Sequence, residues 1–167
     1  MWRPKRSVGK ADYRTKLELA EQMLKEVVAA RLSPEYIVFD THYSPGRFSK
    51  VLDRLGLTWV GTLNPRTTVV WQDKRQSVRG LAIKLPLKWR KRLGVQAAAV
   101  TVYAPKYGKL RLVVTRNRHG NYEYIVTNDL GTDLTKLVLR KRSRWSIETV
   151  FHDTKQFGGL ESCQAWV

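Results

Sequence analysis

One carboxylate and two cations fall on a single face of a predicted helix near the end of the chain. Ser143 can cap this helix, about four turns follow without Gly or Pro, and two consecutive glycines end it. At about 100° per residue, Arg144, Glu148 and Lys155 share one narrow face beside a broad apolar stripe. The pattern is compatible with a surface ion pair worth about 0.2–0.5 kcal/mol, and equally with a functional carboxylate held at the margin of a core.

Asp40 is the second candidate carboxylate. It follows a short apolar run, Tyr36 to Phe39, which is bounded by a proline and a turn and therefore predicts a buried strand. Asp40 lies at the carboxyl end of that strand, where ligands gather in open α/β sheets. A carboxylate that only forms a turn or enters the next helix is the alternative interpretation.

The segments on either side of this strand predict a layered α/β unit. A capping box of Thr15 and Glu18 begins one helix, and Ser44 caps a second helix. Residues 58–63 predict another strand. The order helix, strand, helix, strand implies parallel pairing of the two strands.

Further along, the pattern changes to β structure. Four runs rich in Val, Ile, Leu and Tyr predict strands at 78–85, 95–103, 110–115 and 122–127. Arg118 to Asn121 predicts a hairpin turn between the last two. Thr132 is then expected to cap a helix that runs to Arg142 and leads into the helix of Glu148.

These motifs together resemble those of a known enzyme family. Arg-x3-Glu-x6-Lys at Arg144, Glu148 and Lys155, followed by Gly-Gly-Leu-Glu-Ser-Cys-Gln, is similar to the C-terminal signature of DDE transposases from bacterial insertion sequences. The matching branch reads Tyr-x2-Arg-x3-Glu-x6-Lys, and Lys141 occupies its Tyr position. The run Ile-Val-Phe-Asp-Thr-His-Tyr around Asp40 resembles the strand end that carries the second catalytic Asp of that family. The resemblance spans about residues 10–165.

The resemblance implies a partial RNase H-like α/β fold interrupted by a β-rich insertion. We expect a basic arm at 1–14, the core at 15–70 and 131–167, and the insertion at 71–130. Only Asp12 precedes Asp40, and its surroundings are polar and non-periodic, so the first catalytic Asp of the family has no counterpart here. The chain is therefore expected to begin after the first three strands of the core, which leaves the strand before Asp40 without one neighbour.

The resemblance also implies the chemistry. DDE transposases cut and join DNA with two divalent cations, Mg²⁺ or Mn²⁺, which carboxylate oxygens bind well. Asp40 and Glu148 would be metal ligands, while Arg144 and Lys155 would hold DNA phosphates, and Lys141 could do the same. Without the first Asp, this chain alone is expected to keep DNA affinity and little or no catalysis. The alternative is a non-catalytic DNA-binding or inhibitory protein that pairs with a second copy or with full-length transposase.

Net charge independently favours a nucleic-acid partner. The chain has 31 Lys and Arg against 14 Asp and Glu, a net charge of +17. Its densest basic cluster comprises Lys88, Arg90, Lys91 and Arg92, and Trp71 and Trp89 are candidates for stacking on unpaired bases. No run of about 18 apolar residues occurs, so we expect no membrane partner and a cytoplasmic, nucleoid-associated protein.

The remaining residue types that often bind metals give no pattern. His42, His119 and His152 have no partner at ligand spacing, and ordinary surface or packing roles are expected for them. Cys163 is the single cysteine, so neither a disulfide nor a thiolate metal site is predicted.

Overall fold

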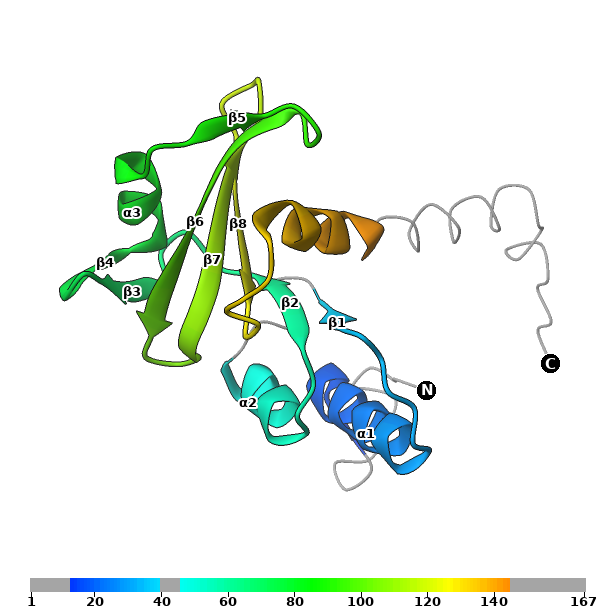
Figure 1. The fold of residues 1–167 in the computed structure, drawn as a ribbon. Helices are drawn as coiled ribbons and strands as arrows, with labels where there is room; N and C mark the ends of the chain where they lie inside the picture. Colours follow the sequence, from blue (N-terminus) through cyan, green and yellow to red (C-terminus); the bar gives the residue numbers. More distant parts are fainter. Residues whose placement is uncertain (1–12, 40–45, 145–167) are drawn as a thin grey trace, which may run out of the picture.

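The computed structural model describes residues 13–39 and 46–144 (Figure 1). The elements, in chain order, are α1 (Lys16–Ala29), β1 (Ile37–Val38), α2 (Gly46–Arg54), β2 (Trp59–Thr62), β3 (Thr68–Trp71), β4 (Lys74–Ser77), α3 (Val78–Lys84), β5 (Lys88–Arg90), β6 (Val95–Ala104), β7 (Gly108–Arg116) and β8 (Tyr122–Thr127). A further helix occupies residues 134–144. The predicted capping box is present, because the Glu18 amide donates to Thr15 Oγ1 at 3.2 Å and the Thr15 amide donates to Glu18 Oε2 at 2.7 Å.

All of the strands in the described ranges belong to one sheet. Its order is β1-β2-β8-β7-β6-β3-β4, with β5 paired to β6 beside this path. The predicted parallel pairing of β1 with β2 is confirmed, and β2 then pairs antiparallel with β8, where Val60 faces Thr127. The predicted α/β class is therefore confirmed, and the arrangement is consistent with a partial RNase H-like fold.

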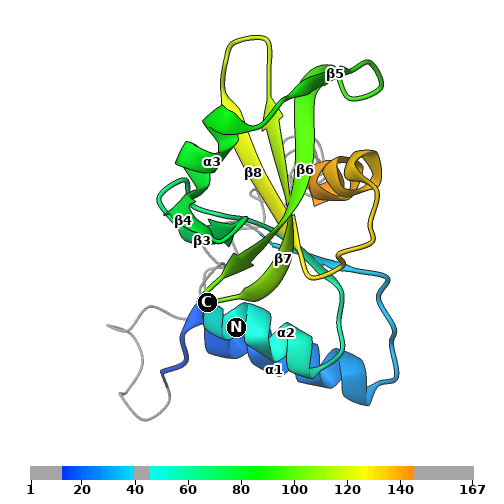
Figure 2. The ribbon, with the colours of Figure 1, turned by 60° about the vertical axis from the view of Figure 1, so that its left-hand side comes forward.

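The sheet carries helices on both faces, and the alternation of side chains along each strand explains why. On β8, Tyr124 and Val126 face a core that includes residues of α1, α2 and α3, whereas Ile125 faces a second core. That second core contains Leu134, Leu137 and Val138 of the helix at 134–144. Figure 2 shows α3 on one side of the sheet and the helix at 134–144 on the other.

The predicted strand at 78–85 is wrong, because residues 78–84 form helix α3. Ser77 caps this helix, with its Oγ accepting from the Gly80 amide at 3.0 Å. Val78, Leu81 and Ala82 are buried, at the i, i+3, i+4 spacing of a helix. A short apolar run fits both periods, and here the packing of α3 against the sheet selects the helix.

The predicted cap of the helix at 134–144 is also wrong by one residue. Asp133 Oδ1 accepts from the amides of Thr135 and Lys136 at 2.8 and 3.1 Å. These bonds hold the pKa of Asp133 below its ordinary value. Thr132 is instead buried, with no hydrogen-bond partner for its hydroxyl among the described residues.

This difference predicts opposite results for neighbouring substitutions. Asp133→Ala should lower the free energy of unfolding by about 1 kcal/mol, because two helix amides lose their acceptor. Thr132→Val should be neutral or stabilising, because it removes a buried hydroxyl that makes no hydrogen bond. Urea unfolding of both variants measures the two effects, and a larger loss for Thr132→Val would contradict this assignment of the cap.

Candidate functional site

The carboxyl end of β1 is held by an aromatic cluster. Phe39, the residue before Asp40, is buried, and its amide donates to the Val60 carbonyl of β2 at 3.0 Å. Its ring centroid lies 5.5 Å from that of Phe48 on α2 and 5.4 Å from that of Trp59 on β2. The chain therefore leaves the sheet toward position 40 from a fixed point.

Gly61 on β2 makes room for this arrangement. A Cβ placed on Gly61 would lie 2.6 Å from Cε2 of the Phe39 ring, closer than any real Cβ contact. Any side chain at this position would therefore push the Phe39 ring away from β2.

The outer edge of β1 is open in the described part of the chain. The Ile37 amide donates to the Thr58 carbonyl just before β2 at 2.8 Å, and the Phe39 amide donates to Val60 of β2 at 3.0 Å, so the amide and carbonyl of Val38 point away from β2. β1 is thus an end strand with hydrogen-bonding groups available to another strand.

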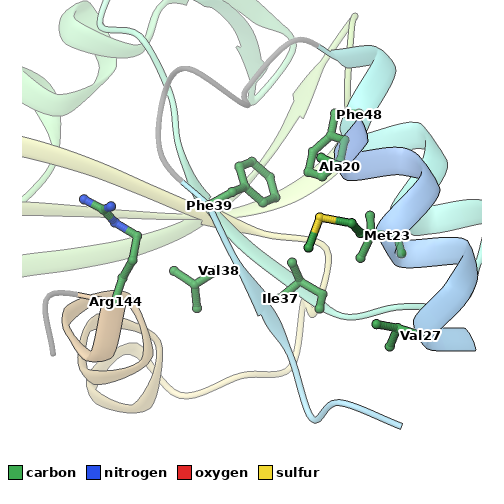
Figure 3. Close-up of a pocket in the computed structure, with 9 residues that line it drawn as sticks. Ala20, Met23, Val27, Ile37, Val38, Phe39, Phe48 and Arg144 are labelled. Carbon is green, nitrogen blue, oxygen red and sulfur yellow. The ribbon is translucent and has the colours of Figure 1, made fainter. Parts of the chain in front are cut away.

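An apolar groove of about 380 Å³ runs along this open edge (Figure 3). Its lining comes from α1, β1, α2 and the end of the helix at 134–144, and includes Met23, Val27, Val38, Phe39 and Arg144. The Met23 side chain is 65% exposed although it belongs to the apolar face of α1. Figure 3 shows Arg144 across β1 from α1, so the groove joins the two helical layers around the strand edge.

A buried guanidinium fixes the segment that enters β1. Arg140, on the helix at 134–144, is ion-paired with Glu35, lies 3.9 Å from Asp129, and stacks over the Tyr36 ring at 4.6 Å from its centroid. Its hydrogen bond to Glu35, together with the charges of Arg140 and Lys136, holds the pKa of the Glu35 carboxyl below its usual value. This cluster connects the helix that leads toward Glu148 with the strand that leads toward Asp40.

The lowered pKa of Glu35 predicts a pH dependence of stability. Its contribution is fully present above the ordinary Glu pKa of about 4.3, and it is lost as the pH falls through the lower value of the folded state. In Glu35→Gln, the free energy of unfolding should therefore fall less steeply on acidification below that pKa than in the unmodified chain. Urea unfolding across the acidic range measures both slopes, and identical slopes would contradict the prediction.

The residues predicted from sequence are divided between described and undescribed parts of the chain. Outside the described residues lie Asp12, Asp40, Ser44, Glu148 and Lys155, as do His42, His152 and Cys163. Among the described residues, no three His, Cys, Asp or Glu side chains come together as metal ligands. The metal-ligand roles of Asp40 and Glu148 stay predictions.

Two of the basic residues predicted near Glu148 lie in the described part of the chain. Arg144 lines the groove, and Lys141 is buried at 6% exposure. Their roles in DNA binding stay predictions. A phosphate could reach Lys141 only if the surrounding side chains moved, whereas Arg144 reaches the groove surface.

The basic cluster lies away from β1, on and beside β5, which pairs with β6. Lys88, Arg90, Lys91 and Arg92 are all exposed on β5 and the turn after it. Trp89 is 44% exposed, and the Arg118 guanidinium lies 5.5 Å from the centroid of its ring. Trp71, by contrast, packs against the core, so Trp89 is the more accessible of the two stacking candidates.

One basic site was missed by the sequence reasoning. Arg66, Arg75 and Lys106 line a cavity of about 290 Å³ together with Thr67 and Tyr107. These residues come from two turns and from β4, so no short sequence motif contains them.

None of the helices in the described ranges has both the length and the apolar composition needed to cross a bilayer.

Comparison with known proteins identifies the family. Residues 3–119 match the family model described as DDE superfamily endonuclease, and this region contains α1, the β1–β2 pair and most of the remaining sheet. No curated protein and no solved structure matched the chain. Endonucleases of the DDE superfamily act on DNA and generally use divalent metal ions. The match covers more than half of the 167 residues, and the chain belongs to the DDE superfamily endonuclease family.

Proposed function

We propose that this chain is part of the catalytic unit of an insertion-sequence transposase of the Tyr-x2-Arg-x3-Glu-x6-Lys branch. The family match over residues 3–119, which includes β1 just before Asp40 and its parallel partner β2, supports the DDE endonuclease class. The Arg-x3-Glu-x6-Lys spacing of Arg144, Glu148 and Lys155 is what favours this branch. In this proposal Asp40 and Glu148 bind Mg²⁺ or Mn²⁺, and Arg144 and Lys155 hold DNA phosphates beside them. Bound divalent ions would activate the attacking oxygen and stabilise the leaving oxygen of the phosphodiester.

The domain division remains part of the proposal. Residues 15–70 and 131–167 would form the RNase H-like core, 71–130 the insertion, and 1–14 a basic arm. The pairing of β2 with β8 joins the proposed core and the proposed insertion in one sheet.

The open edge of β1 supports the further proposal that another segment completes the site. The outward amide and carbonyl of Val38 and the apolar groove along the edge offer both hydrogen bonds and apolar contacts to an added strand. A strand with a carboxylate at its end would supply the first catalytic Asp. Until it is supplied, this chain should bind DNA and cleave it poorly.

A plasmid-nicking assay with Mg²⁺ or Mn²⁺ tests the proposal. We expect DNA retention at moderate salt and little nicking by the chain alone. Robust metal-dependent nicking that is lost in Glu148→Gln and in Asp40→Asn would support the catalytic residues but overturn the claim that another segment is needed. Absence of DNA binding at moderate salt would overturn the proposed function itself.

The second candidate is a non-catalytic protein that pairs with intact transposase, and the same open edge of β1 favours it. Co-purification with a full-length relative, and inhibition of that relative's strand transfer, would support this candidate. A homodimer of the chain without either effect would instead favour self-pairing at the edge.

A further inference from the structure

The cavity lined by Arg66, Arg75 and Lys106 has the composition of an anion site. Besides these three cations, it is lined by Thr67 and Thr68, by Tyr107 and by one proline. No carboxylate among the described residues forms an ion pair with any of the three cations. Three like charges around one cavity repel one another, so a bound anion would relieve that repulsion.

The Tyr107 phenol adds no negative charge to the cavity. A phenol keeps its proton at neutral pH, and burial raises the pKa of this one further. Threonine hydroxyls and a phenol can donate hydrogen bonds to anion oxygens, and one guanidinium group can donate to two such oxygens at once.

Backbone hydrogen bonds hold the turn that carries Arg66 and Thr67. The Arg66 amide donates to Asn64 Oδ1 and the Thr67 amide to the Asn64 carbonyl, both at 2.9 Å. The start of α3 is tied to the same turn, since the Arg79 amide donates to the Pro65 carbonyl at 3.0 Å. The cavity wall formed by this turn is therefore organised before any ligand binds.

Sheet register brings the remaining cations to the same place. Val70 on β3 pairs with Arg75 on β4 and with Tyr103 on β6. The antiparallel direction of the second pair carries the start of β3 toward the β6–β7 turn, where Lys106 lies. Residues distant in sequence thus meet at one cavity.

The cavity lies at the end of the sheet that contains the carboxyl ends of β1 and β2. These strands are parallel, so the turn after β2, which carries Arg66, leaves the sheet at the same end as the chain that continues to Asp40. The β6–β7 turn also touches α2, because a Cβ on Gly46 would lie 2.5 Å from the Lys106 carbonyl oxygen. Figure 1 shows this turn beside the start of α2.

We propose that this cavity binds a phosphate of the DNA backbone, with Arg66, Arg75 and Lys106 as its cationic ligands. The proposal rests on the proposed function, since that function supplies DNA as the polyanion. It adds a contact near the end of β6, whereas the basic cluster on β5 pairs with the start of β6.

The test compares two triple variants of the full chain with equal loss of charge. In the first, Arg66, Arg75 and Lys106 are each replaced by Gln. Binding to a fluorescent duplex oligonucleotide should weaken about ten- to a hundredfold near 0.1 M salt, and the slope of log affinity against log salt should fall by about 0.9, the value for one lost phosphate contact.

The matched control replaces Lys25, Lys50 and Arg54, which are exposed on α1 and α2, by Gln. Its salt slope should stay nearly unchanged, because these cations only add to the general field. Equal losses in the two triple variants would overturn the site and leave the proposed function standing, whereas failure of the unmodified chain to bind the duplex would overturn both. Circular dichroism shows whether each variant is folded. Should the cavity triple variant not fold, Arg66→Lys with Arg75→Lys replaces it, and unchanged duplex affinity in that pair would overturn the site.

A second measurement separates a DNA phosphate from a free one. Amide shifts of Thr67, Thr68 and Lys106 should move on addition of the duplex and return when the salt concentration is raised. Shifts with inorganic phosphate, together with unchanged duplex affinity in the cavity variant, would overturn the DNA assignment in favour of a small anion.

Discussion

Trp59→Ala is expected to lower the free energy of unfolding by about 3–5 kcal/mol. Trp59 is 1% exposed, and its ring packs beside Phe39. Its indole Nε1 donates to Asp53 Oδ1 at 2.8 Å, and its backbone amide donates to Asn128 Oδ1 at 3.0 Å. Loss of the ring would open a large cavity between α2 and the sheet and leave the Asp53 carboxylate without one donor.

Two further variants separate packing from hydrogen bonding. Trp59→Phe keeps much of the ring volume and loses the bond to Asp53, so a loss of about 1–2 kcal/mol is expected. Trp89→Ala removes a ring that is 44% exposed, and it should cost less than about 1 kcal/mol. Urea unfolding followed by circular dichroism measures all three, and equal losses for Trp59→Ala and Trp89→Ala would contradict the packing described for Trp59.

Gly61→Ala is expected to cost about 1–3 kcal/mol through overpacking. The added methyl would meet the Phe39 ring, at 2.6 Å from Cε2 and 3.0 Å from Cζ. That ring cannot retreat freely, because it is buried against Phe48 and Trp59. The strain falls on the residue before Asp40, so the variant should also impair any metal-dependent cleavage by an assembled enzyme.

Gly131→Ala is the matched control, since its Cβ would lie 3.7 Å from the nearest atom, an ordinary contact. It should change the free energy of unfolding by less than about 0.5 kcal/mol. Combining Gly61→Ala with Phe39→Leu should recover part of the loss, because the smaller side chain relieves the contact. A double-mutant cycle by urea unfolding measures this coupling, expected at about 1 kcal/mol, and strict additivity would contradict a direct contact.

The sequence by itself determined those features that depend on neighbouring residues. The Thr15–Glu18 capping box, the strands at 95–103 and 122–127 and the hairpin turn between β7 and β8 were all predicted, because caps, turns and period-two alternation are local signals. The resemblance around Asp40 and Glu148 likewise led to the DDE superfamily, which the family match confirms.

Tertiary structure decided what depends on distant residues. Residues 78–84 became helix α3 because packing selected one of two periods, and Asp133 rather than Thr132 caps the helix at 134–144 because Thr132 is buried. Sheet pairing made one sheet of core and insertion and left β1 at its edge. It also gathered Arg66, Arg75 and Lys106 around one cavity. Such assemblies are set by strand register and by contacts across the sheet, and no short stretch of sequence encodes them.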